Sequence, residues 1–337
     1  MLFSESKSGH ADDAILVLSP APGPVARAAG AGSIAGRGSQ GMTISPAPTT
    51  DRSSRMPILV GLGLVGLVAV TLAGALVVGR AGGAHGPFSP TGSMTTGRYG
   101  ATATALPDGR VLIAGGYGNG SNSPMIASAE LYDRATGTFS PMGSMTTARA
   151  GHTATLLSDG RVLIAGGRSA VSGGSYSSLT SAELYDPATG TFSPIGSMSV
   201  ARFQYTATLL QDGRVLVAGG EETNGEVVAS AELYDPTTGS FRRTGSMAAP
   251  RYWHTAALLS DGRVLIAGGD DGSKSLASAE LYDPGTGGFS AAGSMASDRF
   301  SQAATLLSSG RVLIAGGGQS PQPDVVRTTA SAELFQP

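Results

Sequence analysis

The sequence predicts an all-β fold of five four-stranded sheets closed into a ring, preceded by one transmembrane helix and a disordered tail. Three observations predict this fold. Residues 88–337 repeat one pattern five times, at a spacing of about 50 residues. Each repeat holds short apolar runs separated by tight-turn residues. Residues 57–79 carry no charge, whereas residues 1–56 are rich in small residues and proline.

Composition excludes several classes of protein. The 337 residues include 51 glycines and no cysteine, and the formal net charge is −2. Without cysteine there are no disulfides, thiolate metal sites or cysteine nucleophiles. Glycine does not recur at every third position, so the chain is not collagen-like. The charge balance and the lack of long basic runs argue against a nucleic-acid partner.

The first 87 residues predict a membrane anchor. Residues 1–56 hold few large apolar side chains, so they cannot offset their chain entropy by burial and are expected to be disordered. Residues 57–79 as a helix reach about 34 Å, enough for a single pass through a hydrocarbon core of ~30 Å. Arg52 and Arg55 precede this span and Arg80 follows it, which predicts a cytoplasmic N-terminus. Residues 80–87 are a linker to an extracytoplasmic repeat region.

A cleaved signal peptide is the alternative to an anchor. If translation begins at Met42, Arg52 and Arg55 form the charged region and residues 58–72 the apolar region. Ala73-Gly74-Ala75 then fits a cleavage site, and the protein is secreted. Both alternatives place residues 88–337 outside the membrane.

Each repeat predicts four strands in a fixed order. An arginine follows the Met of a Gly-Ser-Met sequence by four residues, and a run of small residues such as 102–106 forms the first strand. An Asp-Gly or Ser-Gly turn leads into Arg-Val-Leu-(Ile/Val)-Ala-Gly-Gly, the second strand, because glycine accepts the positive φ of a tight hairpin. Ser-Ala-Glu-Leu-Tyr forms the third strand. After a turn that ends in Thr-Gly, Thr-Phe-Ser-Pro or a related sequence begins the fourth.

The strand count predicts a closed five-bladed β-propeller. Residues 88–94 match a fourth strand alone, four complete units follow, and the last unit ends with a third strand at Phe335. The two ends therefore complete one shared blade, which leaves no exposed edge. A truncated six-bladed ring is the alternative, but it does not explain why the two ends are complementary.

These repeats resemble kelch repeats over residues 88–337, like those of bacterial kelch proteins and of the central domain of galactose oxidase. The resemblance rests on the Gly doublet after an apolar strand, the Tyr-Asp pair, and an aromatic residue seven positions beyond that tyrosine. Kelch units usually carry Trp at that last position. Here the residues are Phe88, Phe139, Phe192, Phe241 and Phe289.

The recurrent arginines and glutamates predict a scaffold contact. Five arginines (Arg98, Arg149, Arg202, Arg251 and Arg299) match five glutamates (Glu130, Glu183, Glu232, Glu280 and Glu333) in number and phase. An ion pair within or between blades, or an arginine–carbonyl hydrogen bond, is favoured for each unit, because buried arginine is usually paired. A ring of arginines that binds an anion is the alternative.

Candidate ligand-binding residues come from the two zones in which the units differ. Loop length varies only between the second and third strands, and side chains vary after the recurrent arginine. The kelch resemblance implies that both zones line one mouth of the central channel. The candidates are Tyr117, His152, Arg168, Gln204, Tyr205, Glu221, Trp253, His254, Asp270 and Gln302. Alternatively, His152 and His254 simply begin the first strand.

The expected function is non-catalytic binding of a glycan or a protein ligand outside the cell, because an aromatic–polar rim suits either. No catalytic residue and no cofactor is predicted, and the cysteine-linked cofactor of galactose oxidase cannot form. Glu221, Glu222, Asp270 and Asp271 offer a weaker case for Ca²⁺ or for acid–base chemistry. The alternative function is therefore a carbohydrate-active enzyme of isomerase or hydrolase type.

Overall fold

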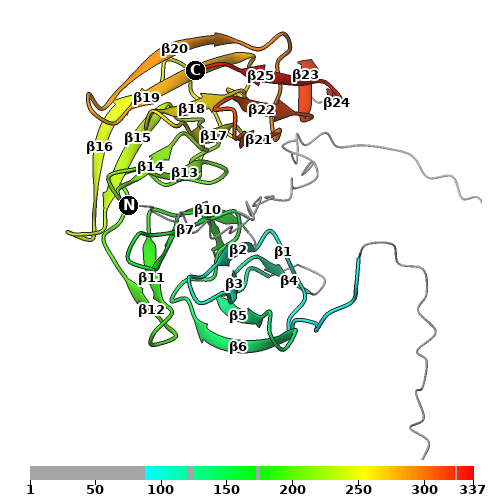
Figure 1. Cartoon of the computed structure of the whole chain (residues 1–337), viewed down its shortest axis with the longest axis vertical. Helices are drawn as coiled ribbons and strands as arrows, with labels where there is room; N and C mark the ends of the chain where they lie inside the picture. The colour runs from blue at the N-terminus through cyan, green and yellow to red at the C-terminus, as the bar shows by residue number, and fades with distance from the viewer. Residues whose placement is uncertain (1–87, 120–123, 172–174, 323–324) are drawn as a thin grey trace, which may run out of the picture. The chain divides into compact units, whose positions relative to one another are not determined.

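A computed structural model describes residues 88–337, apart from 120–123, 172–174 and 323–324. Within these ranges the chain forms 25 β-strands and no helix, in agreement with the predicted all-β fold (Figure 1). The expected tail (1–56), transmembrane helix (57–79) and linker (80–87) lie outside the described residues. In the described part, no helix has the length and apolar character to span a membrane.

Five antiparallel sheets follow one another along the chain, with strands in the expected order. Sheet 1 contains β2 (Thr102–Ala105), β3 (Val111–Ala114), β5 (Ser128–Asp133) and β6 (Thr138–Ser144). Sheet 2 contains β7 (Thr153–Leu156), β8 (Val162–Ala165), β11 (Ala182–Asp186) and β12 (Thr191–Pro194). Sheet 3 contains β13 (Thr206–Leu209), β14 (Val215–Ala218), β15 (Ser230–Asp235) and β16 (Ser240–Ser246). Sheet 4 contains β17 (Thr255–Leu258), β18 (Val264–Ala267), β19 (Ser278–Asp283) and β20 (Gly288–Ser294). Sheet 5 has three strands, β21 (Ala303–Leu306), β22 (Val312–Ala315) and β25 (Ala332–Phe335).

The tight turns form where glycine and aspartate predict them. Between β2 and β3, Gly109 takes a φ of 85°, and Asp108 Oδ1 accepts the N–H of Arg110 at 3.0 Å. The Arg110 guanidinium also pairs with the Asp108 carboxylate at 2.6 Å, and this contact lowers the pKa of the carboxyl. The same Asp-Gly-Arg turn closes the first hairpin of sheets 2, 3 and 4.

The hydrophobic core lies between consecutive sheets. One cluster joins Leu112 and Leu131 of sheet 1 to Val162, Ile164 and Tyr185 of sheet 2, and equivalent clusters follow along the chain. Each fully buried aliphatic side chain of this size contributes about 1.5–3 kcal/mol. The innermost strands also pack in sequence order, β2 on β7, β7 on β13, β13 on β17 and β17 on β21 (Figure 1).

Each of these junctions carries a side-chain contact between the first residue of one innermost strand and a buried polar residue ahead of the next. His152 Nε2 lies 3.0 Å from the Thr102 hydroxyl, and His254 Nε2 lies 2.9 Å from that of Thr206. The other two contacts join Tyr205 to Thr153 at 2.9 Å and Gln302 to Thr255 at 3.5 Å. We call these four contacts junction staples.

The expected closure of the ring is not formed. Residues 88–94 contain no strand, and β25 pairs with β22 alone among the described strands. A junction between β21 and β2 would place Ala303 and Ala101 at the staple positions, and neither side chain can form a hydrogen bond. Figure 1 shows β2 and β21 separated, at the two ends of the row of innermost strands.

The segment before β1 (Arg98–Tyr99) nevertheless contacts sheet 1. It does so in the way that the fourth strand of one sheet contacts the next sheet along the chain. Gly92 N–H donates to Gly137 O at 2.8 Å, as Gly245 N–H does to Gly287 O. The Thr91 hydroxyl lies 2.9 Å from that of Tyr132. Residues 88–94 therefore lie against sheet 1 but do not pair with β25, and the predicted closure is wrong.

Candidate functional site

The two variable zones meet at one end of every sheet. The residue after each recurrent arginine pairs through its backbone with the residue that begins the loop after the second strand. These pairs are Tyr99–Tyr117, Ala150–Arg168, Phe203–Glu221, Tyr252–Asp270 and Phe300–Gly318. We call the surface made by these pairs and by the described residues of the loops that follow them the mouth face.

Short ladders also form in segments predicted to be loops. They are β1 with β4 (Tyr117–Gly118), β9 (Arg168–Ala170) with β10 (Tyr176–Ser178), and β23 (Gly318–Gln322) with β24 (Val325–Thr328). These ladders give the mouth face a hydrogen-bonded backbone at sheets 1, 2 and 5.

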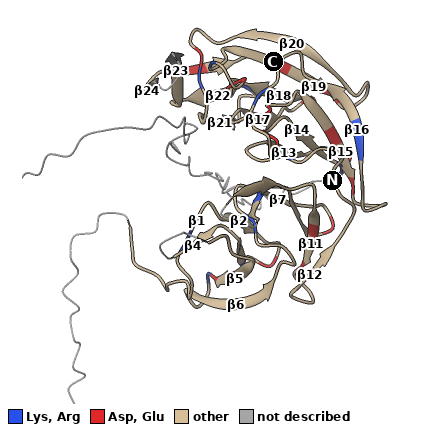
Figure 2. Cartoon of the chain, turned by 180° about the vertical axis from the view of Figure 1, so that it is seen from behind, with Lys and Arg blue, Asp and Glu red and all other residues tan. Residues whose placement is uncertain are grey.

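The recurrent arginines hold the mouth face on the sheets. Arg149 is fully buried; its Nη2 lies 2.9 Å from Glu183 Oε1, and its Nη1 donates to the carbonyls of Gly166 and Ser181 at 2.9 and 3.0 Å. The other Arg–Glu distances are 2.8, 3.1, 2.7 and 2.7 Å. Figure 2 marks acidic positions on β5, β11 and β15, which carry three of these glutamates. The predicted ion pair within each unit is confirmed, and these arginines are part of the scaffold.

Four of the ten candidate residues lie inside the sheet junctions and not on the surface of the mouth face. His152, Tyr205, His254 and Gln302 are the polar members of the junction staples, and each is 5–7% exposed. Burial lowers the pKa of both histidines to about 3 and raises the pKa of Tyr205 to about 12. Both histidines are therefore neutral at physiological pH and serve to join sheets.

Two further candidates, Gln204 and Trp253, occupy a left-handed backbone position. Their φ values are 55° and 54°, and Ser301 at the same place in sheet 5 has 52°, whereas Gly100 and Gly151 fill it in sheets 1 and 2. The conformation lets Trp253 N–H donate to Gln204 O at 3.1 Å, and Ser301 N–H donate to Trp253 O at 2.8 Å. A residue other than glycine pays roughly 1–2 kcal/mol for this conformation.

Trp253 lies in a stack of three rings. Its ring centroid is 4.2 Å from that of Tyr252 and 5.4 Å from that of Phe300. Its indole Nε1 is buried and has no hydrogen-bond partner among the described residues. The Trp253 side chain therefore packs with its neighbours in sheets 4 and 5 and keeps one unused donor.

The charged candidates are partly neutralised within the chain. Arg168 Nη2 lies 2.7 Å from Glu221 Oε1, and its guanidinium carbon lies 4.0 Å above the ring of Phe203. Asp270 is buried and accepts the N–H of Gly272 at 2.7 Å, and burial raises the pKa of its carboxyl. No cluster of three or more histidine and acidic side chains in the described ranges is arranged to hold a metal ion.

The last candidate, Tyr117, belongs to an aromatic group that sequence reasoning named only in part. Its ring stacks on that of Tyr99 with centroids 4.7 Å apart and an interplanar angle of 15°. Tyr99 is 54% exposed, and Tyr176 on β10 is 45% exposed. The sequence could have predicted Tyr99 and Tyr176 as members of this group, since each is an aromatic residue in a variable zone.

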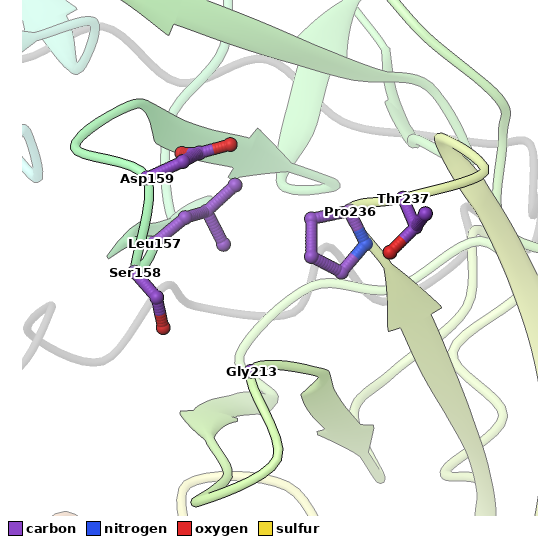
Figure 3. Close-up of a pocket in the computed structure, with 6 residues that line it drawn as sticks. All are labelled: Leu157, Ser158, Asp159, Gly213, Pro236 and Thr237. Atoms are coloured by element: carbon purple, nitrogen blue, oxygen red, sulfur yellow. The ribbon is translucent and has the colours of Figure 1, made fainter.

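A cavity of about 240 Å³ lies at the other end of sheets 2 and 3 (Figure 3). It is lined by Leu157, Ser158, Asp159, Gly213, Pro236 and Thr237. Its single carboxylate, that of Asp159, pairs with Arg161 at 2.6 Å, and none of the ten candidates lines it. The mouth face therefore remains the stronger candidate site.

Comparison with known proteins agrees with the repeat architecture. A family model described as Kelch motif matches residues 149–199 and 254–296, which span sheets 2 and 4. The solved structure titled "Structure of YjhT" aligns with a TM-score of 0.57 and 16% identity, over 70% of this chain and 81% of that chain. The sequence matches no curated protein. These similarities support a kelch-repeat β-propeller and, at this level of identity, concern the fold alone.

Proposed function

We propose that the chain is a non-catalytic binding protein that recognises a glycan or a protein ligand through its mouth face. One observation carries this proposal. The ion pairs and core clusters recur from unit to unit, whereas no two units carry the same residue pair at the mouth face. A rigid scaffold that presents variable loops is a common design for binding.

The polar side chains among the candidate residues are better suited to binding than to catalysis. His152 and His254, with pKa values of about 3, are poorly matched to act as general bases near neutral pH. The charges of Arg168 and Glu221 offset each other. The aromatic side chains that remain offer contact area at low cost in side-chain entropy.

Asp270 supports the alternative of a carbohydrate-active enzyme of isomerase or hydrolase type. A buried carboxyl with a raised pKa is a candidate general acid. An enzyme should convert some sugar and lose that turnover on Asp270→Asn or Glu221→Gln. A binding protein should saturate with the sugar and form no product in either case.

We further propose five as the number of blades, and a single-pass anchor through residues 57–79 with the propeller outside the cell. Five sheets in sequence support the first, and the uncharged run after Arg52 and Arg55 supports the second. Signal cleavage with secretion is the alternative. Activity of a reporter fused after Pro337 only in the cytoplasm would contradict both topologies.

A thermal-shift screen of the full chain tests the binding proposal. The screen uses divalent cations with a chelator control, a panel of glycans and a library of peptides. A ligand at 100 times its Kd adds about 2.7 kcal/mol of stability. A shift with one glycan or peptide class supports binding, and a shift with cations alone would favour the enzyme or a Ca²⁺ role. No shift with any of these would count against the proposal.

A further inference from the structure

We infer that the mouth face of sheets 1 and 2 docks a protein partner whose contacting segment combines apolar residues with adjacent basic residues. The docking surface consists of Tyr99, Tyr117, Val171 and Tyr176, and we call it the tyrosine patch. This inference rests on the proposed binding function. It favours a protein over a glycan as the ligand and places the contact at the tyrosine patch.

The tyrosine patch is fixed by backbone pairing, and three of its four side chains are exposed. Tyr99 pairs with Tyr117 across β1 and β4, and their rings are stacked. Tyr176 pairs with Ala170 across β9 and β10, and Val171 follows β9 directly. Tyr99, Val171 and Tyr176 are 54%, 46% and 45% exposed. Gly100, which follows Tyr99, accepts the N–H of Gly151 at 3.4 Å, and this bond joins the mouth segments of sheets 1 and 2.

The corresponding aromatic residues of sheets 3 to 5 are buried or half-buried. Phe203 is 7% exposed and lies beneath the Arg168 guanidinium. Trp253 stacks with Tyr252 and Phe300. Three of the seven large apolar side chains that are exposed in the described ranges belong to the tyrosine patch. Exposed aromatic area on the mouth face is therefore concentrated on sheets 1 and 2.

The chemistry of the tyrosine patch favours a protein ligand. Tyrosine and arginine are enriched among the residues that dominate protein–protein binding energies. A glycan needs free side-chain donors and acceptors around its ring, and two polar side chains directly beside the patch, Arg168 and Ser177, already have partners. Arg168 is paired with Glu221, and the Ser177 hydroxyl lies 3.2 Å from that of Thr223. The four residues of the patch itself carry no charge, so covering them removes no charged group from water.

Acidic residues beside the patch define the charge of the partner. Thr223 Oγ1 accepts the N–H of Ser178 at 2.9 Å, which fixes the sheet 3 loop against β10. That loop carries Glu222 and Glu226, and neither forms an ion pair among those identified in the described ranges. Basic residues on the partner would complement this edge and speed association at low salt.

The experiment uses the full chain and a phage-displayed library of random peptides as the probe. We expect enrichment of peptides that combine aromatic or aliphatic residues with Lys or Arg. Tyr99→Ser with Tyr176→Ser should weaken the best peptide about tenfold or more. Glu222→Gln with Glu226→Gln should weaken it less and reduce its salt dependence. Leu306→Ser, which replaces an exposed apolar residue on β21, is the matched control and should leave affinity unchanged.

The outcomes separate this inference from the proposed function. Enriched peptides that bind the double tyrosine variant as tightly as the parent would overturn the inference. So would the absence of any enriched peptide. A neutral glycan from an array that binds only when Tyr99 and Tyr176 are present would overturn the choice of a protein partner and keep the binding function. If neither peptide nor glycan binds the parent chain, the inference and the proposed function both fail.

Discussion

The junction staples make stability depend on pH through two buried histidines. His152 and His254 are each 6% exposed, and Nδ1 of each ring has no hydrogen-bond partner among the described residues. A protonated ring would bury a positive charge near Arg149 or Arg251. Burial, followed by these arginines, lowers both pKa values to about 3. The informative perturbation is His152→Gln with His254→Gln, because Gln302 fills the same position in sheet 5.

The sign and size of the effect follow from the two pKa values. The folded-state value of about 3 lies below the unfolded value of ~6.5, so the unfolded chain binds protons first as the pH falls. Stability is therefore fully present above about pH 6.5 and declines toward pH 3. Each histidine costs about 1.4 kcal/mol per pH unit in this window. Between pH 7.5 and 5 we expect a loss of about 2 kcal/mol for each, or about 4 kcal/mol in all.

Urea unfolding of the full chain at pH 7.5, 6 and 5 measures this loss. The parent should lose about 4 kcal/mol between pH 7.5 and 5, each single variant about half of that, and the double variant under about 1 kcal/mol. Carboxyls with lowered pKa values, such as that of Asp108, titrate at lower pH and do not contribute in this window. An equal loss in the parent and the double variant would refute the assignment of the histidines to the junctions.

The remaining predictions concern the scaffold and are tested by the free energy of unfolding at pH 7.5. Arg202→Ala should lower the free energy of unfolding by about 3–5 kcal/mol, because it leaves a buried glutamate unpaired. Arg214→Ala, in an exposed turn, should lower it by under about 1 kcal/mol. Equal losses for the two variants would contradict this prediction. Ser301→Gly should be neutral or stabilising, because glycine accepts a φ of 52°; a clear loss would show that the hydroxyl matters. A double-mutant cycle of Ala101→His and Ala303→Thr should give no coupling energy, since β2 and β21 do not meet; a coupling of about 1 kcal/mol would show a closed ring.

The sequence predicts what happens within one repeat. Asp108-Gly109 fixes the hairpin between β2 and β3, because glycine takes the positive φ and the aspartate holds the following arginine. The recurrent arginine and glutamate predict their own ion pair, since a buried charge needs a partner. The order of all four strands within a sheet follows from the same local signals.

The sequence does not predict what depends on the angle between sheets. Whether the ring closes depends on the angle between neighbouring sheets. The repeat pattern in the sequence does not determine that angle. The direction in which each side chain of the mouth face points is also not predicted by the sequence. Gln204 takes a left-handed backbone conformation, so the next residue, Tyr205, turns into the junction with sheet 2. A shift of one residue thus separates a mouth-face side chain from a structural one, as it does for Trp253 and His254.

The most direct test of the proposed binding surface is hydrogen exchange of the full chain with and without the glycan or peptide that gives the largest thermal shift. We predict slower exchange in the mouth face, in residues 99–101, 117–118, 168–171 and 175–178. The Asp-Gly turns at the opposite end, including residues 159–160 and 212–213, should exchange unchanged. Protection confined to those turns and to the cavity beside Pro236 would place the ligand at the wrong end of the sheets and contradict the assignment.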